Sequence, residues 1–329
     1  MKRKVIEIAG STFMVSLPRA WAVKQGVRKG EEIDVREDGA KVIITREPKN
    51  EVLRTTVDIT GLDRALVKYK IYSAYILGYD EIKIVFHTPT TLYLRTRKEP
   101  DVVNTASLVE EVSHEMIGFE VIDHRSNYFI LKDLGGYTQA EFNDVLKRAF
   151  RLAEDLAEDT LRAVKDMDID TLTNIRETRP KNIKKFIYYS LRFLNKLGTK
   201  DFRKTPSYYH LMIEIKEIVG VYRFIARENV HYHKKLHPKT LSVFERVNAL
   251  FASYIEAFFK GDEKRLLEIQ KERMGIYQSV NQLSEQLTRH DILLLSRLVV
   301  VLNSINHLVE ILVVLQYEDD AKPSPKKQS

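Results

Sequence analysis

A run of short strands separated by turns, residues 4–46, constrains the fold more than any other part of this sequence. Around Phe13, apolar residues alternate with smaller or polar ones, as they do in a half-buried strand. Pro18 stands where a short helix would begin, Gly26 where it would end, and Asp38-Gly39 is typical of a hairpin turn. About forty residues with so few large apolar side chains cannot close a hydrophobic core alone, so this unit is predicted to dimerise.

Positive charge is concentrated at the start of the chain. The formal net charge of +7 is modest for 329 residues, but residues 1–30 hold seven cationic side chains against Glu7 alone. These cations are Lys2, Arg3, Lys4, Arg19, Lys24, Arg28 and Lys29. A small strand-rich unit with this charge can neutralise several phosphates of duplex DNA. The alternative is a solubilising surface that binds nothing.

The N-terminal region, residues 1–47, resembles the AbrB-like (SpoVT/AbrB, also MazE) swapped-hairpin DNA-binding domain. The resemblance rests on Gly10, Leu17-Pro18, the short helix through Trp21, Gly26-Val27, Lys29-Gly30-Glu31 and Asp38-Gly39. It implies an intertwined dimer, a swapped-hairpin β-barrel, whose basic surface lies on double-stranded DNA. The sequence departs from the family in two places. Gly10-Ser11 stands where many members have Gly-Arg, and Ala22-Val23 replaces paired arginines on the helix. We therefore take the seven cations as the expected DNA contacts.

A second region, residues 51–134, follows a breaker cluster at 47–50 and alternates strands with helices, which predicts a small α/β domain. The expected strands are 55–59, 81–86, 91–94, 119–122 and 128–131, and the expected helices are 62–77 and 102–116. No glycine-rich phosphate-binding motif occurs in the sequence. The region is interpreted as a spacer or dimerisation module, with a small-molecule sensor as the alternative.

From residue 138 to residue 317 strand signals are absent and apolar residues recur every three or four positions. Six helices are expected, at 140–164, 169–197, 206–230, 238–259, 263–287 and 291–317. They are predicted to form an antiparallel bundle built as two repeats of three helices. Residues 134–137 are the expected linker before the bundle, and residues 318–329 are expected to be a disordered tail.

Three segments of the helical region stand out: residues 166–170 (DMDID), Pro180 followed by 185–198 (KFIYYSLRFLNKLG), and 208–226 (YYHLMIEIKEIVGVYRFIA). On these segments the region resembles a PhoU domain, which is a pair of three-helix bundles. An AbrB-like head joined to a PhoU-like tail is a familiar archaeal combination. It implies an archaeal-type regulator of phosphate uptake that works as a dimer, with a phosphate transporter or its sensor as a further partner.

PhoU-like proteins can hold iron or zinc clusters on Glu/Asp-x-x-x-Asp motifs in the third helix of each half. Here Glu217 is followed by Val221 in the Asp position, and the second half offers Asn303 and His307. Two carboxylates at this spacing share one helical face and can bridge hard cations, but neither half has the pair. Glu217 and His307 are thus the only remnants of such a site, and we expect no iron or zinc cofactor.

Two further polar clusters have alternative interpretations. Glu154, Asp155, Glu158 and Asp159 form acidic rows that could bind Mg²⁺ or Ca²⁺, although a solvated helix face balanced by nearby arginines is favoured. His231, His233 and His237 resemble a ligand set, but Lys234 and Lys235 stand among them. An exposed polar loop is the favoured interpretation.

The sequence has no cysteine, no nucleophile motif and no signal peptide, and its longest apolar run, 292–301, is interrupted by Ser296 and Arg297. We therefore expect a cytoplasmic protein without enzymatic activity or membrane insertion. The leading hypothesis is a homodimeric, DNA-binding transcriptional regulator of phosphate uptake. In the alternative, the protein is a phosphate-transporter adaptor whose N-terminal unit only dimerises. A third hypothesis is a metal or phosphate sensor without a DNA partner.

Overall fold

The computed structural model describes residues 2–8, 10, 12–38, 41–45, 52–94, 101–136, 138–232, 234–283 and 287–317. The expected linker at 47–50 and the expected disordered tail at 318–329 lie outside these residues. The chain forms two compact units, Met1–Val52 and Leu53–Ser329, which we call unit 1 and unit 2.

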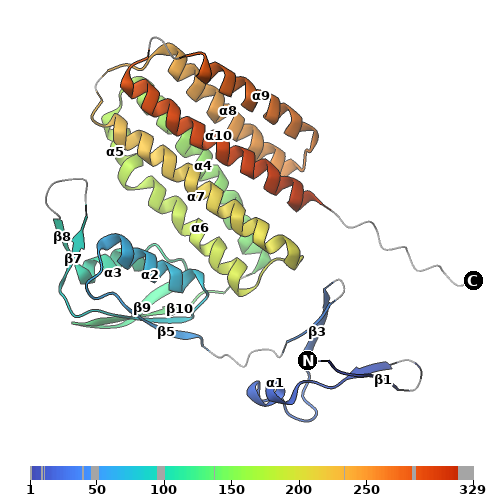
Figure 1. Ribbon diagram of the computed structural model, residues 1–329. Helices are drawn as coiled ribbons and strands as arrows, with labels where there is room; N and C mark the ends of the chain where they lie inside the picture. Colours follow the sequence, from blue (N-terminus) through green and yellow to red (C-terminus); the bar gives the residue numbers. More distant parts are fainter. Residues whose placement is uncertain are drawn as a thin grey trace, which may run out of the picture. The chain divides into compact units, whose positions relative to one another are not determined.

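Unit 1 consists of two separate hairpins and one short helix, in the order expected from the turn residues (Figure 1). Its elements are β1 (Val5–Ile8), β2 (Thr12–Val15), α1 (Arg19–Lys24), β3 (Asp34–Asp38) and β4 (Lys41–Thr45). β1 pairs only with β2 and β3 only with β4, both antiparallel, among the described residues. A two-stranded hairpin is marginally stable in water, so neither sheet of unit 1 is self-sufficient.

The first part of unit 2 is an α/β layer. Its strands are β5 (Arg54–Asp58), β6 (Glu81–Val85), β7 (Thr90–Tyr93), β8 (Asp101–Asn104), β9 (Phe119–Arg125) and β10 (Tyr128–Asp133), and its helices are α2 (Arg64–Ile76) and α3 (Thr105–Ser113). The main sheet has the order β5-β6-β10-β9, with β5 parallel to β6 and the other pairs antiparallel. α2 and α3 cover one face of this sheet, on the side of the helical bundle (Figure 1).

The helix expected from residue 102 begins only at Thr105. Residues 101–104 are instead strand β8, which pairs with β7 through Thr91–Val103 and Leu92–Val102. The β-branched side chains of Val102 and Val103 suit a strand, and the Asn104 side chain accepts a hydrogen bond from the Ser107 backbone N–H at 2.9 Å. The cap at Asn104 therefore makes Thr105 the first residue of this helix, three residues after the expected start.

The remainder of unit 2 is a helical bundle. It contains α4 (Gln139–Asp166), α5 (Ile169–Glu177), α6 (Arg179–Lys196), α7 (Thr205–Asn229), α8 (Pro238–Lys260), α9 (Lys264–Asn281) and α10 (Arg289–Gln316), with a 3₁₀ turn at Phe202–Lys204. The single helix expected at 169–197 is wrong, because the chain breaks at Thr178 between α5 and α6. Pro180 lacks the N–H that an uninterrupted helix would use, and it is tolerated in the first turn of a new helix.

The most apolar helix of the bundle is α10. Its best 18-residue window has a mean hydropathy of 2.2, which by length and composition alone would allow a membrane crossing. Half of that window is buried in the bundle, where α10 packs mainly against α7 and α8. A core helix passes the same test, and the packing of α10 explains its composition.

The α/β layer and the bundle are joined by a buried arginine. Arg192 on α6 is fully buried; its guanidinium donates to the Asp133 carboxylate at 2.7 Å and to the Tyr75 carbonyl at 2.6 Å. The same group lies over the rings of Tyr75 and Phe119, 5.1 and 4.8 Å from their centroids. Next to it, Lys196 pairs with Asp80. These contacts tie α6 to α2 and to β10, so the layer and the bundle form one compact unit.

Candidate nucleic-acid interface

The seven expected DNA contacts are all exposed side chains of unit 1. They precede β1 (Lys2, Arg3, Lys4), open and close α1 (Arg19, Lys24), or lie in the following turn (Arg28, Lys29). Within the described residues none of them forms an ion pair or a side-chain hydrogen bond. Exposed cations without acidic partners are available to phosphate groups.

The backbone of α1 and its flanking turns is held by local hydrogen bonds. The Ala22 N–H donates to the Pro18 carbonyl at 2.9 Å, which fixes Arg19 in the first turn. Gly26 adopts a φ of +63° and ends the helix, because a residue without Cβ takes this conformation at no steric cost. The Arg28 backbone N–H then donates to the Glu31 carboxylate at 2.9 Å. Arg19, Lys24 and Arg28 thus project from a defined local backbone.

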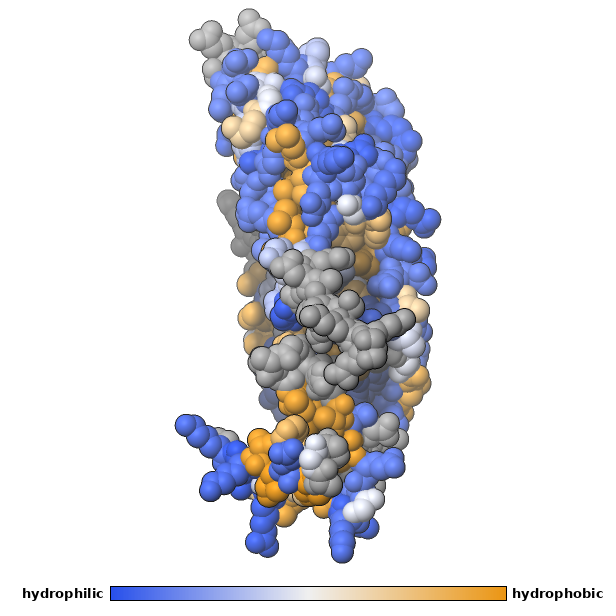
Figure 2. Space-filling view, turned by 90° about the vertical axis from the view of Figure 1, so that its right-hand side faces the viewer, coloured by the Kyte–Doolittle hydropathy of each residue, from blue (hydrophilic) through white to orange (hydrophobic). Residues whose placement is uncertain are grey.

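Unit 1 also exposes its apolar side chains. No side chain that the structure describes in this unit is buried, and Trp21 is only half-buried. The exposed fraction is 72% for Phe13, 63% for Val42 and 60% for Val5. In Figure 2 the apolar residues of unit 1 form a hydrophobic surface flanked by hydrophilic side chains. Leaving this surface in water costs about 25 cal/mol per Å², so unit 1 is energetically incomplete as a single copy.

These features define the class of unit 1: a small basic β-hairpin unit that is incomplete alone, as in AbrB-like swapped-hairpin domains. Residues 8–52 match the model of the MazE family, described as antidote-toxin recognition MazE, bacterial antitoxin. This match confirms the AbrB-like resemblance of the N-terminal region, and domains of this kind typically dimerise and bind DNA. No curated protein and no solved structure matches the chain. The resemblance of the bundle to a PhoU domain stays a prediction.

The two expected remnants of a metal site do not come together. Glu217 is exposed on α7, whereas His307 on α10 places Nδ1 3.0 Å from the Glu214 Oε1. His210 places Nε2 3.2 Å from the same oxygen. Sequence analysis missed this triad, although the four-residue spacing of His210 and Glu214 marks a shared helix face. Among the described residues, no group of three or more His, Asp or Glu side chains is arranged to hold a metal ion.

Metal content provides a direct test. Because Val221 stands where a second carboxylate is needed and Glu214 is engaged by two histidines, we expect purified full-length protein to carry far less than stoichiometric iron or zinc. Elemental analysis of protein prepared without chelators would measure this. Several tightly held ions per chain would contradict the prediction.

The other polar clusters have structural partners. Asp159 pairs with Arg162 and Arg179, and burial together with the charges of Glu158 and Asp155 raises the pKa of Glu154. His237 precedes α8, and its Nδ1 accepts a hydrogen bond from the Lys239 backbone N–H at 3.2 Å. His233 lies outside the described residues. In the described part of the chain, His237 therefore acts as a helix cap.

Proposed function

We propose that this protein is a homodimeric transcriptional regulator that binds duplex DNA through unit 1. The observation that carries the proposal is the set of seven exposed cations that have no acidic partner among the described residues, on a unit whose residues 8–52 match an AbrB-like family. Two copies would double the number of cations on one surface, and each phosphate that they neutralise releases counterions and adds to the affinity.

The dimer follows from the incomplete core of unit 1. Val5, Phe13 and Val42 are exposed in a single copy, and each hairpin has two strands only. Exchange of hairpins between two chains into a swapped β-barrel would bury these side chains and extend both sheets. The burial of apolar area is the main favourable contribution to such an association.

We assign unit 2 the role of receiving the signal. Its helical bundle resembles a PhoU domain, and the combination with an AbrB-like unit supports regulation of phosphate uptake in the cytoplasm, without enzymatic activity. A phosphate transporter or its sensor is then a candidate partner of unit 2. This part of the proposal rests on the sequence resemblance.

The DNA contacts are tested by two single substitutions. We expect Arg3→Ala and Arg19→Ala each to weaken binding to duplex DNA and to lower the slope of log affinity against log salt by about one unit, since each removes one phosphate contact. Neither should lower the melting temperature, because both side chains are exposed and unpaired within the described residues. Arg151→Ala, an exposed arginine of unit 2, is the matched control and should leave the slope unchanged.

If neither substitution changes the affinity or its slope, the DNA surface lies outside these residues. If the wild-type chain binds no duplex even at low salt, the adaptor hypothesis replaces the regulator, and unit 1 serves only to dimerise.

A further inference from the structure

A pocket with a volume of about 210 Å³ lies where the α/β layer meets the bundle in unit 2. α2 and the segment after α3 form one wall, and α5, α6 and α7 form the other. The rings of Tyr72 and Tyr188, which pack against each other at a tilt with centroids 4.6 Å apart, belong to its lining. The pocket lies within one compact unit, so its walls have a defined relation to each other.

Cations predominate among the charged side chains that line this pocket. Its five cationic side chains are Arg64, Lys68, Lys181, Lys184 and Arg223. Three of them share the carboxylate of Glu111, with N–O distances of 2.9 Å to Arg64, 3.2 Å to Lys68 and 2.6 Å to Lys181. Although partial burial acts in the opposite direction, these cations lower the pKa of Glu111 to about 2. Glu115 accepts hydrogen bonds from Lys68 and from the Tyr72 hydroxyl.

The other two cations have no carboxylate partner in the part of the chain that the structure describes. Lys184 makes no hydrogen bond and no ion pair there. Burial and the neighbouring charges of Arg223 and Lys216 lower its pKa, and the smaller opposing effect of Glu115 and Glu217 does not offset them. Arg223 donates its Nε–H to the Arg176 carbonyl at 2.9 Å, which orients the guanidinium, and its two terminal nitrogens have no acceptor among the described residues. Glu177, the remaining carboxylate of the lining, pairs with Arg176.

An unpartnered, partly buried ammonium costs free energy, and an anion placed beside it would recover that cost. The charge of two neighbouring cations matches that of a doubly charged anion better than that of a single carboxylate group. The terminal edge of a guanidinium offers parallel N–H groups that match two oxygens of a phosphate, and a lysine supplies a compact charge beside them.

We propose that this pocket binds a phosphate group, free or carried by a small metabolite, between Lys184 and Arg223. Such a ligand would touch both walls of the pocket and so link α6 and α7 to the α2 side. The inference deepens the proposed function by giving unit 2 a site for its signal; only the link to DNA rests on that function. Phosphate binding itself can be measured without DNA.

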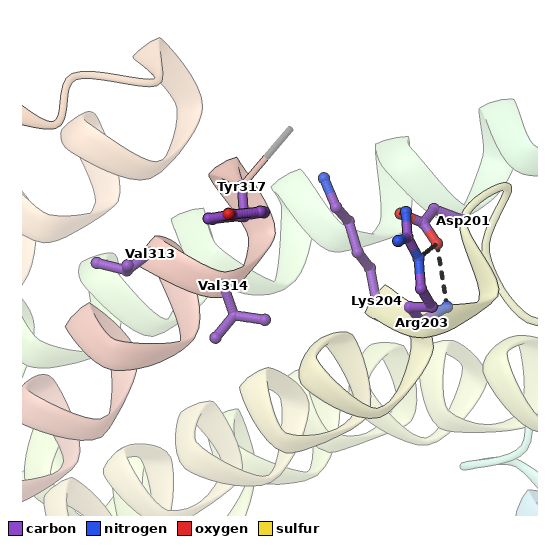
Figure 3. A pocket seen from close by; sticks show the side chains of 6 residues that line it. All are labelled: Asp201, Arg203, Lys204, Val313, Val314 and Tyr317. Carbon is purple, nitrogen blue, oxygen red and sulfur yellow. Dashed lines mark hydrogen bonds and ion pairs between the residues drawn. The ribbon is translucent and has the colours of Figure 1, made fainter. Parts of the chain in front are cut away.

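A second hollow of unit 2 lacks these features. It has a volume of about 310 Å³ and lies beside the end of α10, and it is lined by Val313, Val314 and Tyr317 together with Asp201, Arg203 and Lys204 (Figure 3). The Arg203 side chain donates to the Asp201 carboxylate, and the Lys204 ammonium donates to the Leu315 carbonyl at 2.8 Å. Both cations of this hollow have protein acceptors, so it offers a phosphate no comparable site.

The test measures binding of inorganic phosphate and of ATP to the full chain by isothermal titration calorimetry. We expect Lys184→Ala and Arg223→Ala each to weaken binding of the preferred probe by about tenfold or more, since each removes a charge-assisted contact. Arg223→Lys should recover part of the loss. The adjacent Lys185→Ala is the matched control and should bind as wild type does. Melting temperatures would verify folding, and Lys184→Ala should not lower them, because Lys184 makes no hydrogen bond or ion pair with the described residues and its burial disfavours the charge.

Preference for inorganic phosphate or for ATP distinguishes a free phosphate from a phosphorylated metabolite, and either result supports the pocket. No binding of either probe at millimolar concentration overturns it, as does unchanged affinity in folded Lys184→Ala and Arg223→Ala chains. If the preferred probe shifts the DNA affinity of the wild type but not that of Lys184→Ala, the pocket is the effector site. If it binds without shifting DNA affinity, the pocket stands and its regulatory link fails.

Discussion

Replacement of Arg192 by alanine is expected to lower the free energy of unfolding of unit 2 by about 3–5 kcal/mol. The side chain is fully buried, and its loss would leave the Asp133 carboxylate, whose side chain is only 5% exposed, without its closest cation. It would also remove one of two hydrogen bonds to the Tyr75 carbonyl, which keeps the Gly78 backbone N–H as a donor at 3.1 Å, and the contacts with the Tyr75 and Phe119 rings. Urea unfolding followed by circular dichroism would measure the change.

Arg203→Ala is the control for this measurement, because Arg203 pairs with Asp201 at the surface and exposed pairs contribute little. The double variant Arg192→Met/Asp133→Leu should recover part of the loss, since it leaves no buried charge of that pair unpaired. A loss below about 1 kcal/mol in Arg192→Ala would show that Lys196 suffices to hold the α/β layer on the bundle.

The second large effect concerns the apolar surface of unit 1. We expect Phe13→Asp to abolish dimerisation through unit 1 and to weaken DNA binding by more than about tenfold, because a charge replaces a large apolar side chain at the surface to be buried. Phe13 is 72% exposed in the single chain, so the substitution removes few contacts within it. Sedimentation velocity at micromolar concentration and DNA titration would measure the two effects.

Phe202→Asp applies the same change to an exposed phenylalanine of unit 2 and should leave DNA binding unaltered. If the Phe13→Asp chain bound duplex DNA as tightly as wild type, Phe13 would lie outside the interface, and the swapped-hairpin arrangement would be wrong.

The order of elements could be predicted because alternation and turn residues are local signals. The boundaries were wrong where local signals compete. Apolar periodicity continues across Thr178, so the helix break before Arg179-Pro180 was not recognised. Val102 and Val103 fit the apolar pattern of a helix, and only their pairing with β7 shows that they belong to a strand. The missing N–H of Pro180 decided the first case, and pairing with β7 decided the second.

The candidate sites also differ in how far they could be predicted from the sequence. The cations of unit 1 could be selected as candidates from the sequence because they cluster within thirty residues, and their contact with DNA stays a prediction. The burial of Arg192 could not be predicted from the sequence, because arginine is usually exposed. Its partner Asp133 also lies 59 residues away in the sequence. The pocket was also missed, because α2, α6 and α7 each contribute cations that are unremarkable on their own helix.

The two separate hairpins of unit 1 have a consequence for how much active protein a cell contains. If a hairpin gains its missing neighbours only from a second chain, folding of the DNA-binding surface is a second-order process. Its stability then depends on protomer concentration by mass action. In the dilute range, the amount of competent surface rises with the square of chain abundance. The expression level of the protein would itself act as a threshold, so that halving it removes more than half of the DNA-bound form.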